Sequence, residues 1–244
     1  MYQYNDDSLM LHNDLYQINM AESYWNDGIH ERIAVFDLYF RKMPFNSGYA
    51  VFNGLKRVVN FIENFGFTNE DITYLKSIGY EEDFLNYLKD LKFTGNIKSM
   101  QEGEICFGNE PLLRVEAPLI QAQLIETILL NIINFQTLIA TKASRIRQIA
   151  THDTLMEFGT RRAQEIDAAL WGARAAFIGG FDSTSNVRAG KLFNIPVSGT
   201  HAHALVQTYG DEYIAFKKYA ERHKNCVFLV DTFHTLKSGV PTAI

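Results

Sequence analysis

The stretch TLMEFGTRRAQEIDAALWGARAAFIGGFDSTSN (residues 154–186) decides the fold prediction, because strand-like and helical segments alternate along it. TLMEFG has the composition of a short strand, residues 163–178 carry apolar side chains at helical spacing, and GGFD is the next strand candidate. The alternation continues through IPVSG, a helical segment over 204–223, and NCVFLVD. Strands that alternate with helices are typical of a parallel sheet, open or closed into a barrel. We therefore predict an α/β fold.

The residues before this region show a different, mixed pattern. We expect a strand through 34–40 and a small β region over 93–115. We also expect helices over 55–65 and 84–91, a helix capped by Thr68 between them, and two helices or one bent helix over 119–150. We expect two domains: an N-terminal α+β domain with connecting helices (1–150), and the first part of an α/β barrel (151–244).

The second domain is short for a barrel. A complete eight-stranded α/β barrel needs roughly 250 residues, whereas only about 90 follow Thr154, enough for four strands. We therefore expect the chain to be a fragment.

Composition argues against several classes of protein. The net charge of −5 disfavours a general nucleic-acid binder, and the two cysteines match neither a zinc site nor a disulfide framework. The apolar-rich residues 118–150 are interrupted by Gln, Glu and Asn, so we expect no membrane span. MYQYNDDSLM lacks the pattern of a signal peptide, so a cytoplasmic location is expected.

Each strand candidate of the second domain ends in a polar cluster. The four clusters are residues 159–162, 182–185, 198–203 and 231–234. Because the carboxyl ends of parallel strands line one face, where ligands bind, we expect these clusters to converge. Arg161 and Arg162 suit phosphate or carboxylate, a solvated charged turn being the alternative. Ser183 and Ser185 have two interpretations of equal weight: they bind phosphate, or they are N-caps of the following helix.

The two histidines of SGTHAHALV (198–206) admit three interpretations. In the first, His201 and His203 bind a metal ion together, which would need a further His and an Asp. In the second, one of them is a catalytic nucleophile or base. In the third, both are structural. Nearer the N-terminus, Tyr16 lies in a helix where a core position is the alternative to a site. Arg41 ends a strand beside a proline turn, where edge-strand charge is the alternative.

Taken in order, the motifs resemble the nicotinate phosphoribosyltransferase family. The matching segments are NDLYQINMAESYW, FDLYFRKMPF, EPLLRVEAPLIQAQLIETILLNIINFQTLIATKASRI, EFGTRRAQ, GGFDSTSN, IPVSGTHAHA and LVDTF, which span nearly the whole chain. The resemblance implies an irregular α/β barrel of the type II phosphoribosyltransferase kind. It also implies a homodimer whose active sites use residues from both subunits.

The resemblance further implies a reaction in NAD biosynthesis, on the Preiss–Handler salvage route. Nicotinate and 5-phosphoribosyl 1-diphosphate would give nicotinate mononucleotide and diphosphate, and ATP hydrolysis through a phosphohistidine, with Mg²⁺, would drive the reaction. The alternatives are a truncated remnant that binds or dimerises without catalysis, and a relative that uses nicotinamide or quinolinate.

Site residues follow from the family pattern. GT-x-A-H places the phosphorylated residue at His203 and leaves His201 at a variable position, so no metal pair is expected, while His234 receives no role. The resemblance implies that Tyr16 borders the nicotinate ring, Thr200 contacts nicotinate, Arg161 or Arg162 holds phosphate or carboxylate, Asp231 lies near the ribose or its magnesium, and Arg41 enters the neighbouring subunit's site. The family's later glycine-rich loops are absent, so the 244-residue chain alone should be inactive.

Overall fold

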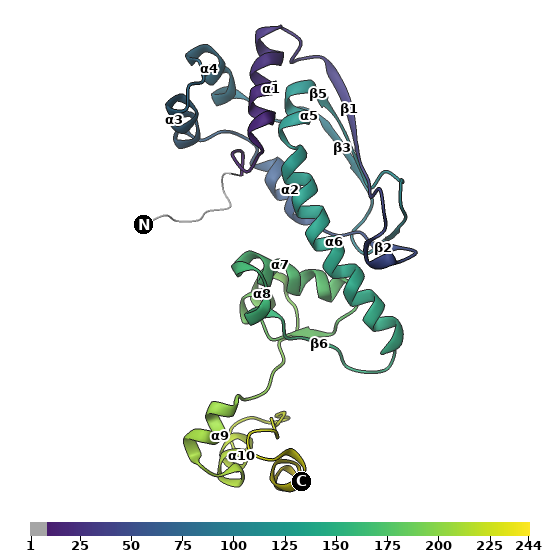
Figure 1. Cartoon of the computed structure of the whole chain (residues 1–244), viewed down its shortest axis with the longest axis vertical. Coiled ribbons are helices and arrows are strands. Elements are labelled where there is room, and N and C mark those ends of the chain that lie inside the picture. The colour runs from purple at the N-terminus through teal and green to yellow at the C-terminus, as the bar shows by residue number, and fades with distance from the viewer. Residues whose placement is uncertain (1–8) are drawn as a thin grey trace.

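The computed structural model describes residues 9–244 (Figure 1). The prediction that the N-terminus carries no signal peptide concerns mainly residues 1–8, which lie outside the described part. Among residues 9–244, no helix combines the length and apolarity needed to cross a membrane.

A three-stranded antiparallel sheet organises the N-terminal half, in the order β1 (Ile33–Leu38), β5 (Leu113–Pro118) and β3 (Asn96–Ser99). Along β5, Leu113 and Val115 are buried, whereas Arg114 is exposed and pairs with Asp37 across the strands at 2.7 Å. The inner face packs against helices, so the period-two pattern of β5 places one side in the core and the other in solvent.

Helices cover the inner face and the side of this sheet, as Figure 1 shows. They are α1 (Leu15–Asn26), α2 (Leu55–Glu63), α3 (Asn69–Ser77), α4 (Glu82–Asp90), α5 (Leu119–Leu124) and α6 (Glu126–Ile149). The predicted bend in the last segment is real, because Ile125 separates α5 from α6. Thr68 caps α3 as the sequence indicates.

Helix α6 also holds a second, smaller pair of strands, β2 (Ala50–Val51) and β4 (Ile105–Cys106). Thr141 accepts the N–H of Val51 at 2.9 Å, and Thr137 accepts the N–H of Asn53 and donates to its carbonyl, both at 3.1 Å. These buried hydroxyls satisfy backbone N–H and C=O groups that a neighbouring strand would otherwise pair with, and so they fix β2 against α6.

The same part of α6 also packs against α7 (Glu165–Ile178), with very little space between the two backbones. A Cβ added at Gly179, just after α7, would lie 2.4 Å from the carbonyl oxygen of Ala140 and 2.7 Å from Cβ of Ala143. Any side chain at position 179 would therefore force α6 and α7 apart.

Parallel pairing confirms the α/β alternation of the second half, but over very few residues. β6 (Met156–Glu157) pairs in parallel with β7 (Ser183–Thr184), Thr184 forms a parallel bridge to Val197, and Thr200 forms one to Val227. The prediction of a strand at GGFD (179–182) is wrong in its bounds, since β7 begins only after Asp182. That carboxylate is held before the strand by Arg147, at 2.5 Å, and by the N–H of Leu155.

The predicted helix over 204–223 is two helices, α9 (His203–Tyr209) and α10 (Glu212–Ala220). Gly210 ends α9 with φ +70°, and Asp211 starts α10 by accepting the N–H of Ile214 at 2.8 Å. The remaining helices are η1 (Pro44–Asn46), η2 (Thr160–Arg162), α8 (Val187–Phe193), η3 (Thr235–Gly239) and α11 (Val240–Ala243).

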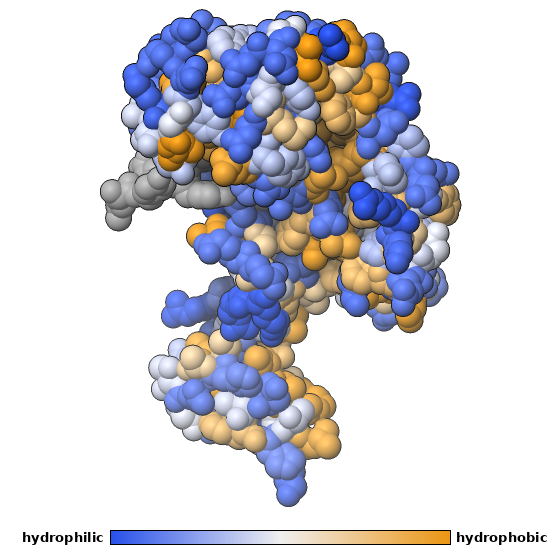
Figure 2. Space-filling view, turned by 45° about the horizontal axis from the view of Figure 1, so that its top comes forward, coloured by the Kyte–Doolittle hydropathy of each residue, from blue (hydrophilic) through white to orange (hydrophobic). Residues whose placement is uncertain are grey.

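Residues from about 200 onward form a small unit with its own apolar cluster. Val206, Ala215 and Phe216 are buried there, and Phe228 and Val230 pack against them. Figures 1 and 2 show this unit below the larger body and joined to it by a narrow neck. It therefore lies at the opposite end of the molecule from α1 and the β1–β5–β3 sheet.

Candidate active site

His203 is the first residue of α9, and its ring is half exposed. Its Nδ1 lies 3.2 Å from the Thr232 hydroxyl, and its Nε2 lies 3.9 Å from Oδ1 of Asp231. The structure thus brings two polar clusters, 198–203 and 231–234, into contact. The hydroxyl orients the ring, the carboxylate lies beside it, and Nε2 makes no hydrogen bond within the described residues. This is the arrangement of an accessible, oriented imidazole.

His201 has the opposite surroundings and is buried. Its Nε2 accepts the N–H of Leu229 at 3.2 Å, so the proton sits on Nδ1, which faces the carbonyl oxygen of Ala202 at 3.3 Å. Its ring lies 5.5 Å from that of Phe216 and 5.1 Å from that of Tyr219. His201 is therefore a structural residue, and the two histidines do not act on one ligand.

His234, to which the family pattern assigns no role, caps the helical turn η3. Its Nδ1 accepts the N–H of Lys237 at 3.2 Å. Thr200 is exposed, and its hydroxyl donates to the carbonyl oxygen of His201 at 2.8 Å. The Thr200 side chain thus lies at the surface, three residues before His203.

The arginine turn lies at the carboxyl end of β6. Arg161 and Arg162 are both exposed in η2. Arg162 donates to the carbonyl oxygen of Phe158 at 3.1 Å, whereas the Arg161 guanidinium has no partner within residues 9–244. Arg161 is therefore the one of the two that is uncommitted and available to an anion.

The serines after Asp182 do not cap a helix. Asn186 is the N-cap of α8, and its side chain accepts the N–H of Ala189 at 3.0 Å, so the capping alternative for Ser183 and Ser185 is wrong. Ser183 is buried, and its hydroxyl has no partner within residues 9–244. The N–H of Ser185 donates to the carbonyl oxygen of Glu157 at 2.9 Å.

Glu157 is a polar residue of this region that the motif reading overlooked. Its carboxylate accepts the Thr184 hydroxyl at 2.7 Å and also the N–H of Gly159. An acidic residue inside an otherwise apolar strand segment, directly before the arginine turn, was the available signal.

Tyr16 and Arg41 meet at a pocket of about 420 Å³ in the N-terminal half, lined also by Tyr39, Asn131 and Asn134. Tyr16 is 48% exposed, so the core alternative is wrong. Partial burial, together with the nearby carboxylates of Glu126 and Asp14, raises the pKa of Tyr16 and keeps its hydroxyl protonated.

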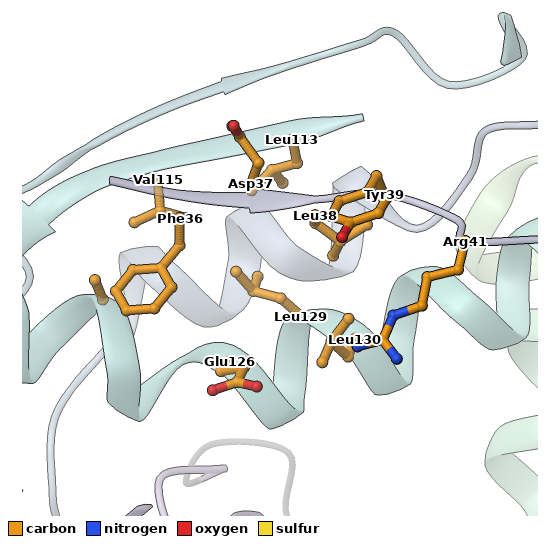
Figure 3. A pocket seen from close by; sticks show the side chains of 11 residues that line it. Phe36, Asp37, Leu38, Tyr39, Arg41, Leu113, Val115, Glu126, Leu129 and Leu130 are labelled. Atoms are coloured by element: carbon orange, nitrogen blue, oxygen red, sulfur yellow. The ribbon is translucent and has the colours of Figure 1, made fainter. Parts of the chain in front are cut away.

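A second pocket, of about 230 Å³, adjoins the first beneath β1 (Figure 3). Phe36, Leu38 and Leu129 give it apolar walls. Figure 3 shows Arg41 extending beside Leu130 of α6, with Glu126 on the same helix. The two pockets share Arg41, so one guanidinium borders both spaces.

The predicted site residues therefore form three groups within one chain. Tyr16 and Arg41 line one pocket, Arg161 follows β6 while Ser183 and Ser185 lie in and just after its partner strand β7, and His203 meets Asp231. The polar clusters touch as neighbours along the chain of parallel pairs: the N–H of Ser198 donates to the carbonyl oxygen of Thr184 at 3.0 Å, and Nδ1 of His203 lies 3.2 Å from the Thr232 hydroxyl. Their convergence on one ligand stays a prediction. The exposed Gly199 separates the bridge at Val197 from the bridge at Thr200, and so the third group lies beyond the neck.

Residues 11–134, about half of the chain, match the family described as nicotinate phosphoribosyltransferase (NAPRTase) N-terminal domain. The chain belongs to the nicotinate phosphoribosyltransferase family. A nicotinate phosphoribosyltransferase from Bacillus subtilis (strain 168) is 67% identical over 244 residues, which is 100% of this chain and 50% of the relative. That of Dictyostelium discoideum is 40% identical over 95% of this chain and 46% of its own length. The chain spans about half the length of these curated relatives.

Solved structures agree with this membership in the nicotinate phosphoribosyltransferase family. Human nicotinic acid phosphoribosyltransferase is 31% identical, with a TM-score of 0.85 over 94% of this chain and 56% of that chain. Nicotinate-nucleotide pyrophosphorylase from Pyrococcus furiosus is 25% identical, with a TM-score of 0.77 over 96% of this chain and 53% of that chain. The predicted α/β phosphoribosyltransferase fold is thereby confirmed.

Proposed function

We propose that this chain is the N-terminal half of a nicotinate phosphoribosyltransferase that acts in NAD biosynthesis, on the Preiss–Handler salvage route in the cytoplasm. Its substrates are nicotinate and 5-phosphoribosyl 1-diphosphate, and its products are nicotinate mononucleotide and diphosphate. The single observation that carries the proposal is His203 in GT-x-A-H, half exposed and oriented by Thr232 and Asp231. Its buried neighbour His201 cannot take this part.

His203 accepts the γ-phosphoryl group of ATP, and ADP leaves. The exposed Nε2 face is open to an incoming phosphoryl group. The phosphoimidazole then adds an anion beside the bound substrates and biases their binding. Hydrolysis of the N–P bond by water returns free His203 and inorganic phosphate, which couples the cycle to ATP.

The ribose transfer is a displacement in which the pyridine nitrogen of nicotinate attacks C1 of the ribose, and the bond from C1 to the diphosphate oxygen breaks. Arg161 neutralises charge on the leaving diphosphate, and Thr200 contacts nicotinate. Within residues 9–244 no three metal-ligating side chains converge. Asp231 is an exposed carboxylate, and this fits the usual binding of Mg²⁺ by one or two carboxylates together with substrate phosphate oxygens.

Tyr16 lies in α1, which Figure 1 places far from α9, the helix that begins with His203, so one subunit cannot place both residues around one ligand. A homodimer with shared sites removes the difficulty, because the Tyr16 pocket of one subunit then faces the His203 group of the other. The outer face of β1 supports such an interface, since Ile33 and Val35 are 66% and 56% exposed.

A chimera tests the proposal: residues 1–244 of this chain followed by the second half of the Bacillus relative. With γ-labelled ATP we expect acid-labile label and, with both substrates, nicotinate mononucleotide. His203→Ala should lose the label and ATP-coupled turnover, and His223→Ala is the matched control that keeps both. The 244-residue chain alone should give no turnover. Label that persists in His203→Ala, or a clear preference for nicotinamide or quinolinate, would contradict the proposal.

A further inference from the structure

The carboxylate of Glu157 links two turns that follow parallel strands. Its Oε2 accepts the Thr184 hydroxyl at 2.7 Å, and its Oε1 accepts the N–H of Gly159. Glu157 and Thr184 are paired in register between β6 and β7, so the sheet itself holds the two side chains side by side. Both carboxylate oxygens are thereby occupied by donors from this chain.

The direction of these hydrogen bonds is fixed. Thr184 is fully buried, and its hydroxyl accepts the N–H of Asn186 at 3.0 Å. Its own proton is therefore directed at Glu157, and the acceptor there is a carboxylate oxygen. A continuous chain runs from Asn186, the N-cap of α8, through Thr184 and Glu157 to Gly159.

Gly159 is the residue from which the arginine turn is built. Its carbonyl oxygen accepts the N–H of Arg162 at 2.8 Å and that of Ala163 at 3.0 Å. Glu157 fixes the same residue through its N–H group. The peptide groups on both sides of Gly159 are thus held, and the position of Arg161 follows from them.

Gly159 itself has ordinary backbone angles, φ −83° and ψ −7°, that alanine also adopts. A Cβ at this position would lie 2.6 Å from Oε1 of Glu157, however, which is well inside van der Waals contact. A side chain at position 159 would therefore have to displace the carboxylate of Glu157, whereas the backbone conformation would not oppose it.

We propose that Glu157 and Thr184 are positioning residues that set the Gly159–Arg162 turn, so that Arg161 meets the diphosphate group of the substrate. Neither residue touches that group, because their polar atoms are engaged with each other and with the backbone. The inference rests on the proposed function for the identity of the anion. It assigns roles to Glu157 and Thr184 in addition to those of Arg161 and His203. Both roles concern the binding of only one substrate, the one that carries the diphosphate group.

Inorganic diphosphate binding by the 244-residue chain, measured by calorimetry, tests the proposal directly. Thr184→Val keeps the shape of the buried side chain and removes the hydroxyl, and we expect about tenfold weaker binding, the size of one lost hydrogen bond to a charged group. Thr184→Ser should restore the affinity. Gly159→Ala, which pushes the carboxylate away from the other side, should weaken binding as Glu157→Ala does. Arg161→Ala shows how much of the affinity the turn supplies.

The chimera adds a readout that a merely structural role would not move. Thr184→Val should raise KM for 5-phosphoribosyl 1-diphosphate about tenfold, the same lost hydrogen bond, while KM for nicotinate stays unchanged. Diphosphate binding that needs Arg161 but is equal in Thr184→Val, Glu157→Ala and the wild type would overturn the inference, as would a wild-type chain that binds no diphosphate. A chimera without activity, combined with Glu157-dependent binding, would instead contradict only the proposed function.

Discussion

At the scale of single residues, two histidines separated by a single alanine have separate tasks. His201 fills an aromatic cluster and accepts a backbone N–H, whereas His203 points to solvent. The family motif points to His203, and that assignment stays a prediction. The burial of His201 could not be read from the sequence, because its partners Phe216, Tyr219 and Phe228 come later in the chain and meet it only after α10 has packed.

The contrast gives a stability prediction. His201→Ala removes a buried ring and leaves the N–H of Leu229 without its acceptor, so we expect a loss of roughly 2–4 kcal/mol in the free energy of unfolding. His203→Ala at the exposed neighbour should change it by less than about 0.5 kcal/mol. Urea denaturation followed by circular dichroism distinguishes the two. Equal losses would contradict the structural role of His201.

The two cysteines should differ in reactivity. Burial, reinforced by the charge of Glu110, raises the pKa of Cys106 to about 11, and its Sγ lies 3.5 Å from the carbonyl oxygen of Ala50. Cys226 is partly exposed. At pH 8 a thiol reagent should therefore label Cys226 rapidly and Cys106 only after unfolding. Cys106→Ser is the control: it should leave the rapid phase unchanged, and a lost rapid phase would reverse the assignment.

At the scale of elements, helices were better predicted than strands. The start of α3 is local, because Thr68 and Asp71 cap it reciprocally: Thr68 accepts the N–H of Asp71 at 3.1 Å and donates its own N–H to that carboxylate at 2.8 Å. The limits of β7 are not local. They depend on Met156 and Glu157, residues on a strand more than 20 positions earlier, and so the sequence placed this strand two residues or more too early.

The capping of α3 is testable. Thr68→Ala removes the side-chain acceptor and should lower the free energy of unfolding by about 1 kcal/mol. Thr68→Ser keeps the hydroxyl and should lower it by only a few tenths of that amount. Thermal melts of the three proteins provide the measurement. An alanine variant as stable as the wild type would show that the reciprocal cap adds nothing.

At the scale of the whole molecule, α7 is tied to the N-terminal half by ion pairs. Arg174 binds Glu102 at 2.6 Å, and Glu102 also accepts the N–H of Gly54 at 3.0 Å. Arg57 of α2 binds Asp167 of α7 at 2.8 Å. No local pattern revealed these pairs, since their members lie 72 and 110 positions apart. The division into domains 1–150 and 151–244 remains a prediction.

The first of these pairs makes the interface sensitive to acid. Burial pushes the pKa of Glu102 up, but the hydrogen bond and charge of Arg174 and the N–H groups of Lys56 and Gly54 outweigh it, so the pKa lies below its usual 4.5. A lowered pKa in the folded state means that the stabilisation is complete above pH 4.5 and is lost as the pH falls through the lower value.

Glu102→Gln should therefore lower the free energy of unfolding at pH 7 by roughly 2 kcal/mol, with a smaller difference from the wild type below pH 4. Glu82→Gln is the matched control. Glu82 pairs with Lys76 at the surface, where an ion pair contributes little. Melting curves between pH 3 and 7 provide the measurement. A difference between Glu102→Gln and the wild type that does not change with pH would contradict the assignment.

The placement of the site residues was the least predictable feature at this scale. The motifs name Tyr16, Arg161 and His203 correctly as exposed polar positions, but nothing in them fixes the distances between the groups. Those distances depend on how α6 and α7 cross and on the neck before Thr200, which are properties of packing.

The crossing at Gly179 has a mechanical consequence. Because no flexible side chain separates the backbones of α6 and α7 there, the two helices have little room to move relative to each other. On one side of this contact Leu129 and Leu130 of α6 line the pocket that Arg41 borders, and on the other side Arg147 of α6 pairs with Asp182, directly before β7. We therefore expect a ligand that shifts α6 at the pocket to shift the β6–β7 pair as well, and with it the turn that carries Arg161.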